Sequence, residues 1–99
     1  MYLNKGNRVI GIYTVSVGGI SGTVADIRLI LGVALKTAAT GLILTHNHPS
    51  GNLKPSSADV DLTRKIVEAG KFMDIKVLDH LILTPQEGSF YSFAEEGIL

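Results

Sequence analysis

The apolar residues recur at two different spacings along the chain, and these spacings predict which segments are helical and which are extended. Between residues 26 and 38 they recur every three or four positions, with Asp26 placed as an N-cap and Gly41 expected to close the helix. The same spacing predicts a second helix from about Ser57 to Met73. The inward-facing residues expected of the two helices are Ile27, Leu31, Ala34 and Ala38, then Leu62, Ile66, Ala69 and Met73.

Short apolar runs predict the strands. Val9 to Val17 alternates and is rich in β-branched residues, whereas Leu42 to Leu44 and Val77 to Leu83 are continuous runs, typical of strands covered on both faces. Two shorter strands are expected at 2–3 and 90–91, with loops at 4–7, 18–22, 47–55 and 86–88 and a helical turn at 93–97. The order β-β-α-β-α-β-β predicts an α/β fold, in which a mixed sheet is flanked by helices.

The first predicted strand is short. Only Tyr2 and Leu3 precede the turn residues Asn4 to Asn7, whereas strands usually run about five or six residues. We therefore interpret residues 1–99 as a single domain that is truncated at its N-terminus. A homodimer that pairs through the edge of the sheet is a further expectation.

Composition and charge narrow the class of protein. With 45% hydrophobic residues, 99 positions suffice for one small globular domain. The formal net charge is zero and the basic residues are scattered, so the domain lacks the positive track that nucleic-acid binding requires. The sequence shows neither a membrane-length apolar run nor a signal peptide, and it has no cysteine. These features favour a cytoplasmic location.

The candidate chemistry gathers where the strand over 42–44 ends. His46 and His48 are two residues apart on extended backbone, so both imidazoles point to the same side and can reach one ion. Binding sites in α/β folds collect at the carboxyl ends of strands, which is where this pair lies. A lone His-x-His pair is also common among ordinary surface histidines, so a third ligand is needed to decide the interpretation.

Helical periodicity selects Asp59 as that third ligand. It lies three residues before Leu62 on the inward stripe of the second helix, whereas Asp61 points away. An inward carboxylate is costly unless it is paired or bound to a metal. Two imidazoles and one carboxylate leave the fourth position of a tetrahedral zinc for water, which is the catalytic pattern. Asp59 could instead complete a capping box with Ser56, and both interpretations stay open.

These residues resemble a known family signature. The run His46-Asn47-His48-Pro49-Ser50, five residues, Ser56, two residues and Asp59 is similar to the JAMM motif of the JAB/MPN metalloprotease superfamily. The stretches 46–51, 69–71 and 77–80 resemble its RadC-type branch, and the likeness extends from Gly22 to Ser92. The resemblance implies a cytidine-deaminase-like α/β sandwich and a Zn²⁺ ion held by His46, His48 and Asp59. It also implies hydrolysis of an amide bond in a peptide or protein substrate.

The resemblance assigns two further roles. The Ser56 hydroxyl would stabilise the oxyanion formed when zinc-bound hydroxide attacks an amide carbonyl, although Ser56 could instead serve only as a helix cap. The superfamily also uses a glutamate on an upstream strand as general base, and the only acidic residue before His46 is Asp26. We expect that glutamate, like the helix-hairpin-helix region found in the family, to precede Met1. A missing general base lowers a rate by about 10²–10⁴.

Several other polar and aromatic residues invite an interpretation. Asp79 and His80 interrupt an apolar strand, so at least one should be buried and hydrogen-bonded, either as a structural group or behind a zinc ligand. Lys54 and Arg64 are predicted to be solvated surface charges, and contact with a substrate stays open. The aromatic residues expected to pack in the core or at the sheet edge are Tyr13, Phe90, Tyr91 and Phe93.

Three functions remain in competition. The first is a zinc-dependent metallopeptidase or isopeptidase, the second a DNA repair-associated protein, as the naming of RadC-type proteins suggests, and the third a zinc-binding module without catalysis. Two other metal sites are excluded. A metallo-β-lactamase-type site needs Asp and His where Ser50 and Gly51 stand, and nucleoside deaminases need cysteine ligands.

Overall fold

The structure is a computed structural model that describes residues 1–13 and 26–99. Its strands form one five-stranded sheet in the order β2-β1-β3-β4-β5, in which β3 and β4 are parallel and the other neighbours antiparallel. The strands are β1 (Tyr2–Leu3), β2 (Val9–Gly11), β3 (Gly41–Asn47), β4 (Lys76–Leu83) and β5 (Phe90–Ser92), and the helices are α1 (Ile27–Lys36) and α2 (Ser57–Phe72). The predicted α/β class with a mixed sheet and two helices is confirmed.

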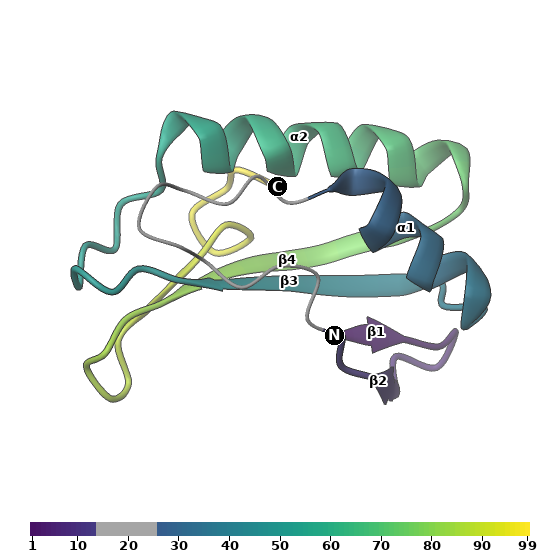
Figure 1. Cartoon of the computed structure of the whole chain (residues 1–99), viewed down its shortest axis with the longest axis horizontal. Helices are drawn as coiled ribbons and strands as arrows, with labels where there is room; N and C mark the ends of the chain where they lie inside the picture. Colours follow the sequence, from purple (N-terminus) through teal and green to yellow (C-terminus); the bar gives the residue numbers. More distant parts are fainter. Residues whose placement is uncertain (14–25) are drawn as a thin grey trace.

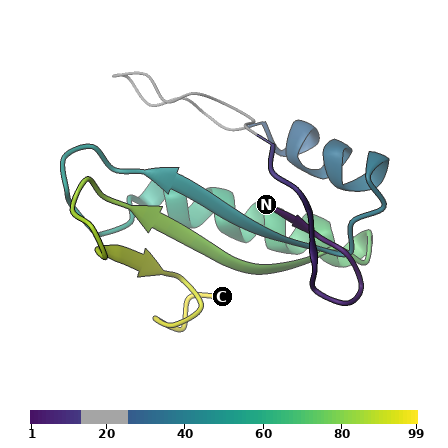
Figure 2. The same cartoon turned by 90° about the horizontal axis from the view of Figure 1, so that it is seen from below.

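Both helices lie on the same face of the sheet (Figures 1 and 2). Leu42 of β3 points toward them and is 1% exposed, whereas its neighbour Ile43 is only half-buried and Thr45 is exposed. In the described part of the chain, no helix covers this second face. The expectation that β3 is covered on both faces is therefore wrong for residues 1–13 and 26–99.

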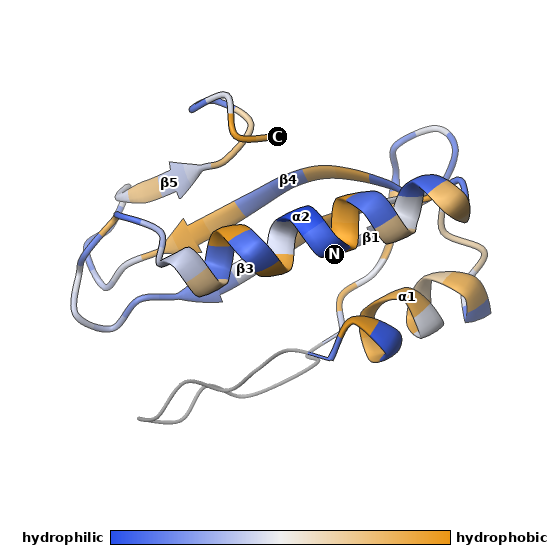
Figure 3. Cartoon of the chain, turned by 90° about the horizontal axis from the view of Figure 1, so that it is seen from above, coloured by the Kyte–Doolittle hydropathy of each residue, from blue (hydrophilic) through white to orange (hydrophobic). Residues whose placement is uncertain are grey.

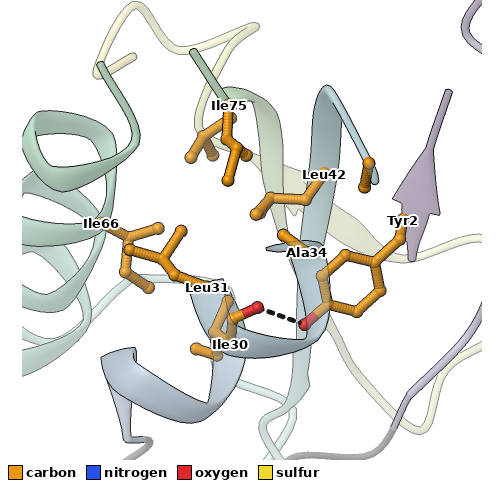
Figure 4. Packing of buried hydrophobic residues seen from close by; sticks show 9 residues of the cluster. Tyr2, Ile30, Leu31, Ala34, Leu42, Ile66 and Ile75 are labelled. Atoms are coloured by element: carbon orange, nitrogen blue, oxygen red, sulfur yellow. Dashed lines mark hydrogen bonds between the residues drawn. The ribbon is translucent and has the colours of Figure 1, made fainter. Parts of the chain in front are cut away.

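The core fills the space between the two helices and the sheet. Its buried members come from both helices and three strands, together with the two residues that follow the helix ends: Tyr2, Ile30, Leu31, Ala34, Ala39, Leu42, Ile66, Ile75 and Val77. Figure 4 shows the Tyr2 hydroxyl reaching across this core to donate a 2.7 Å hydrogen bond to the carbonyl of Ile30. Strand β1 is short, and this buried bond ties it to α1.

Helix α1 ends earlier than its apolar spacing predicts. Asp26 caps its start as expected, but the helix ends at Lys36. Ala38 then adopts a left-handed conformation with φ of 55°, and Ala39 donates a 2.9 Å bond back to the Ala34 carbonyl. This is a Schellman ending. Ala38 is consequently exposed rather than on the inward stripe, and Gly41 opens β3 instead of closing the helix; both predictions are wrong.

Helix α2 begins and ends as its sequence requires. Ser56 caps it, and apolar and polar residues alternate around its length (Figure 3). Asp74 repeats the left-handed ending with φ of 55°, which lets the Ile75 amide donate to the Gly70 carbonyl at 2.9 Å. A Cβ on Gly70 would lie 2.4 Å from the Ile75 carbonyl oxygen, so only glycine fits this close approach.

The remaining expectations have mixed outcomes. Strand β2 ends at Gly11, so Ile12 and Tyr13 are not in a strand, and 14–17 and the loop at 18–22 fall outside the described residues. Phe93 is fully buried and Tyr91 packs against it, as expected. Phe90 lies on the edge strand β5 and is about half exposed, as is Tyr13. Residues 93–97 form the expected turn. Within the described residues, no helix is both long and apolar enough to span a membrane.

Candidate metal centre

The proposed ligands come from two elements that meet at one end of the sheet. His46 is the penultimate residue of β3 and His48 follows directly after the strand, while Asp59 lies in the first turn of α2. Because side chains alternate along β3, the two imidazoles both point to the face that α2 covers. The capped start of α2 then places the carboxylate of Asp59 above them. The structure thus brings together the three residues selected from the sequence.

The three side chains converge closely. The Nε2 atoms of His46 and His48 are 2.9 Å apart. Each of these nitrogens also lies near its own oxygen of Asp59: His46 Nε2 is 3.3 Å from Oδ1, and His48 Nε2 is 3.2 Å from Oδ2. One candidate atom from each residue lies within 4.8 Å of the other two, which is compact enough to hold a metal ion. In the described residues, no other group of histidines and carboxylates does so.

Asp59 forms the capping box that the sequence left open, and its position also allows the alternative of a metal ligand. Its Oδ2 accepts a 2.8 Å bond from the Ser56 amide, while the Asp59 amide donates to Ser56 Oγ at 3.0 Å, so the capping box is complete. The same carboxylate faces both histidines. Burial raises the pKa of Asp59, but the hydrogen bonds from Ser56 and the neighbouring imidazoles outweigh this effect and hold the pKa below its usual value. The carboxyl group is therefore ionised at neutral pH.

His48 is oriented by the loop that follows it. Its Nδ1 lies 2.7 Å from the backbone carbonyl oxygen of Asn52. A carbonyl oxygen can only accept, so Nδ1 must carry the hydrogen. In a neutral imidazole this leaves a lone pair on Nε2, the atom that faces His46 and Asp59. The tight loop after β3 thus leaves Nε2 of His48 available as an acceptor.

His46 is oriented by a different partner. Its Nδ1 lies 2.9 Å from Nε2 of His80, whose Nδ1 in turn lies 2.6 Å from the hydroxyl of Thr63. Burial lowers the pKa of His46, and the adjacent His48 lowers it further. The nearby Asp59 raises this pKa, but the effect of burial is larger, so the pKa lies below its usual value. Burial also lowers the pKa of His80, to about 4. Both imidazoles are therefore neutral at pH 7, the form that a metal ligand needs.

Asp79 and His80 point to opposite faces of β4, and they form a hydrophilic segment in the middle of this strand (Figure 3). His80 is 3% exposed and stacks on Phe93 with a ring-centroid distance of 4.6 Å. Asp79 instead accepts hydrogen bonds from the Ser92 hydroxyl at 2.6 Å and the Ala94 amide at 3.0 Å. Asp79 thus anchors the chain after β5, and His80 contacts the candidate ligand His46.

A pocket lies beside His48 and the residue that caps α2. Its volume is about 450 Å³, and its lining includes His48, Lys54 and Ser56. The hydroxyl of Ser56 accepts from Asp59 through a lone pair, so its own hydrogen is free to donate toward this pocket. Lys54 is exposed at the pocket wall, and Arg64 is exposed on α2 outside the lining.

Two residues that take part in the hydrogen bonds around the candidate metal centre were not predicted from the sequence. Thr63 is 1% exposed, and its spacing of four residues from Asp59 on α2 was an available signal, because residues four apart share a helix face. The contribution of Asn52 comes from its backbone carbonyl, which no side-chain pattern reveals.

Comparison with known proteins agrees with the fold and with the residue signature. Residues 1–98 match the family described as RadC-like JAB domain. The UPF0758 protein of Flavobacterium johnsoniae is 53% identical over 98 residues, which cover 99% of this chain and 42% of that protein. The UPF0758 proteins of Porphyromonas gingivalis and Salinibacter ruber are 40% and 43% identical over 99 residues, with 43% and 42% of their lengths covered. This chain spans about two fifths of the length of these relatives. Because the match extends over almost every residue, the chain belongs to the RadC-like JAB domain family.

Proposed function

We propose that this domain is the metal-binding part of a zinc-dependent amide hydrolase that acts on a peptide or protein substrate. One observation supports the proposal above the others: two imidazole nitrogens and a carboxylate converge on one point. Two nitrogens and one oxygen make up the donor set that catalytic zinc sites prefer, with a further position open. Zinc bound there would supply a Lewis acid and lower the pKa of a water molecule to about 7.

The hydrogen-bond network supports a cation at this point. The Asn52 carbonyl keeps the hydrogen of His48 on Nδ1, so the Nε2 lone pair of His48 faces an ionised carboxylate oxygen at 3.2 Å. Two acceptors at this distance repel each other unless a cation or an additional proton lies between them. A zinc ion held by His46, His48 and Asp59 would remove this repulsion without an additional proton.

The chain's own residues would position the substrate. The pocket beside His48 has room for part of a peptide, and Ser56, which lines it, can rotate its hydroxyl hydrogen toward a bound carbonyl oxygen. A donor of this kind stabilises the negative charge that develops on a carbonyl oxygen during attack, typically by a factor of about 10²–10³. The proposed role of Ser56 in catalysis is therefore compatible with its cap.

The strand register indicates where a general base would act. Tyr2 pairs with Leu42 and Leu3 with Gly41 in an antiparallel arrangement. Residues that extended β1 upstream in this register would run along β3 toward its carboxyl end, and so toward His46. A glutamate on such an extension would reach the metal centre, which is where the resemblance expects a proton acceptor.

A zinc-binding module without catalysis is the second candidate. It rests on the same cluster, whose ligands come from β3 and α2, so that a bound metal would join the two elements and stabilise the fold without any reaction. Involvement in DNA repair remains a prediction, and the zero net charge of the chain does not support it.

Zinc binding by the purified domain tests the proposal. We expect one zinc ion per chain, and we expect Asp59→Asn to weaken the affinity by at least about 100-fold, since removal of an outer-shell residue alone typically costs 10–100-fold. Asp61→Asn is the matched control, because Asp61 is an exposed carboxylate two residues further along the same helix. Zinc binding that is equal in both variants would contradict the proposed ligand set.

Catalysis needs a second experiment. A longer protein that extends β1 upstream and includes a glutamate should cleave peptide or isopeptide bonds, and Asp59→Asn should abolish this cleavage. Full zinc occupancy without cleavage of any peptide or isopeptide substrate would favour the non-catalytic module. Salt-sensitive binding of DNA by the domain would instead favour the repair-associated function.

A further inference from the structure

A continuous chain of hydrogen bonds runs from His46 through β4 to the backbone of α2. His46 Nδ1 lies 2.9 Å from His80 Nε2, His80 Nδ1 lies 2.6 Å from Thr63 Oγ1, and Thr63 Oγ1 donates to the Asp59 carbonyl at 2.7 Å. The path therefore starts at the strand ligand and ends at the residue that provides the helix ligand. We call these three hydrogen bonds the His80–Thr63 relay.

Each hydrogen in the relay has only one arrangement that satisfies all partners. The Asp59 carbonyl can only accept, so the Thr63 hydroxyl donates its single hydrogen there. Thr63 Oγ1 must then accept from His80, which places the His80 hydrogen on Nδ1. A neutral His80 consequently has a lone pair on Nε2 and accepts from His46 Nδ1. This leaves the lone pair of His46 on Nε2, the atom that faces Asp59 and His48.

The packing around the relay leaves little freedom to rearrange. Thr63 and His80 are 1% and 3% exposed, respectively. The His80 ring also lies against Phe93, with an interplanar angle of 18° and a centroid distance of 4.6 Å. A ring held on one face by an aromatic residue and at both nitrogens by hydrogen bonds cannot turn without losing buried contacts.

We infer that His80 and Thr63 are positioning residues that fix the tautomer and the ring orientation of His46, so that its Nε2 is held ready for a metal ion. This inference rests on the proposed function. Neither residue belongs to the ligand cluster, and both act through His46. His48 needs no such support, because the loop carbonyl of Asn52 already sets its tautomer. The two histidine ligands thus have separate means of orientation.

Replacement of Thr63 distinguishes this role from plain packing. In Thr63→Val the side chain keeps its shape but offers no acceptor to His80, whose hydrogen can then move to Nε2. That hydrogen would face His46 Nδ1 and drive the His46 hydrogen onto Nε2, where it blocks the metal. We expect a 10–100-fold loss of zinc affinity, measured by competition with a chelator. Thr63→Ser restores the hydroxyl and should recover the affinity.

A matched control separates stability from positioning. Ile66→Val removes one buried methylene from the same helix, three residues further along, and leaves the relay intact. Its midpoint of thermal unfolding should fall by roughly 2–12 °C with no change in zinc affinity. Equal loss of zinc affinity in Thr63→Val and Ile66→Val would show that the effect is only structural, and would overturn the inference.

The tautomers can also be measured without any variant. Long-range ¹H–¹⁵N NMR spectra of the wild-type domain with zinc should show His80 with its hydrogen on Nδ1 and His46 bound through Nε2. A His80 hydrogen on Nε2 would overturn the inference while leaving zinc binding intact. Failure of the wild type to bind zinc would instead overturn the proposed function, and the inference with it.

Discussion

Ser56 uses the two ends of its hydroxyl group differently. The oxygen accepts from the Asp59 amide at 3.0 Å, and the hydrogen remains available to the neighbouring pocket. Ser56→Ala should therefore lower the free energy of unfolding by about 1 kcal/mol, the usual cost of losing an N-cap. Urea unfolding of the metal-free domain measures this cost. In an active, longer protein the same change should also slow hydrolysis by about 10²–10³.

The cap and the catalytic donor can be told apart by a second substitution. Ser56→Thr retains both the acceptor oxygen and the donor hydrogen, so the stability and the hydrolysis rate should both stay close to wild type. Ser57→Ala, at the adjacent exposed position, should change neither. A Ser56→Ala protein that loses stability but keeps its full hydrolysis rate would show that Ser56 is a cap alone.

The positions of single residues could be predicted where helical periodicity or the alternation of side chains along a strand determines them. Periodicity on α2 separated Asp59 from Asp61, and extended backbone put His46 and His48 on one face. Thr63 and the Asn52 carbonyl were missed because their contributions depend on contacts across the fold. No local pattern distinguishes a buried threonine that bonds to a histidine from one that only fills space.

Between elements, the contact of α2 with the segment that leads into β4 gives a sharp prediction. Gly70→Ala would place a Cβ 2.4 Å from the Ile75 carbonyl oxygen, and that atom is backbone and cannot move freely. We expect the substitution to lower the free energy of unfolding by about 1–3 kcal/mol, as overpacking usually does. Thermal or urea unfolding measures the change.

Gly32 of α1 is the matched control. A Cβ there would meet nothing within 4 Å, so Gly32→Ala should gain about 0.5–1 kcal/mol from helix propensity alone. A Gly70→Ala protein that is as stable as Gly32→Ala would contradict the close approach of α2 to Ile75.

Tyr2 links β1 to α1, and it makes the free energy of unfolding depend on pH in the alkaline range. Burial raises the pKa of its phenol above the ordinary value of 10.0, with a smaller contribution from Tyr13. Below pH 10 the phenol of Tyr2 is protonated in both the folded and the unfolded chain. Above it the unfolded chain ionises first, so the free energy of unfolding should fall as the pH rises through 10.

The Tyr2→Phe substitution tests this link. It removes the 2.7 Å bond to Ile30 and should lower stability by about 1 kcal/mol at pH 7. It should also remove the part of the alkaline loss that Tyr2 causes, as measured by urea unfolding at pH 7 and pH 10.5. An alkaline loss of the same size in both proteins would contradict a raised pKa at Tyr2.

The ends of the elements were harder to predict than their existence. Apolar spacing continued to Ala38, but the chain had to leave α1 earlier to enter β3, and Ala38 supplies the left-handed residue for that exit. Alanine is unfavourable in this conformation by roughly 1–2 kcal/mol, so no composition signal marks the position. Likewise, the continuous apolar run in β3 does not indicate that both helices pack on the same face of the sheet.

At the scale of the whole molecule, zinc should stabilise the fold. The centre joins β3 to α2, and a ligand that binds only the folded state adds about 2.7 kcal/mol at 100 times its dissociation constant. For a domain of this size we expect a rise of roughly 10–20 °C in Tm. Differential scanning fluorimetry with zinc measures it. Magnesium should have little effect, and zinc should not raise the Tm of Asp59→Asn.

Two properties of the whole protein stay predictions from the sequence. The sheet has β2 and β5 at its edges, and exposed Val9 and Ile10 lie on β2, so sedimentation of the purified domain would test the expected homodimer. The cytoplasmic location is likewise untested. Neither property is encoded in the local patterns that define the helices and the metal centre.

The compact spacing of the ligands also affects the order of folding. All three lie between residues 46 and 59, whereas the pairing of β3 with β4 brings together segments much further apart in the chain. Closing a short loop loses little conformational entropy, so the three ligands could bind an ion before β4 pairs with β3. Only the orientation of His46 by His80 would have to wait for that strand. An ion captured so early would act as a nucleus that speeds folding, and the same contacts would later serve the mature site.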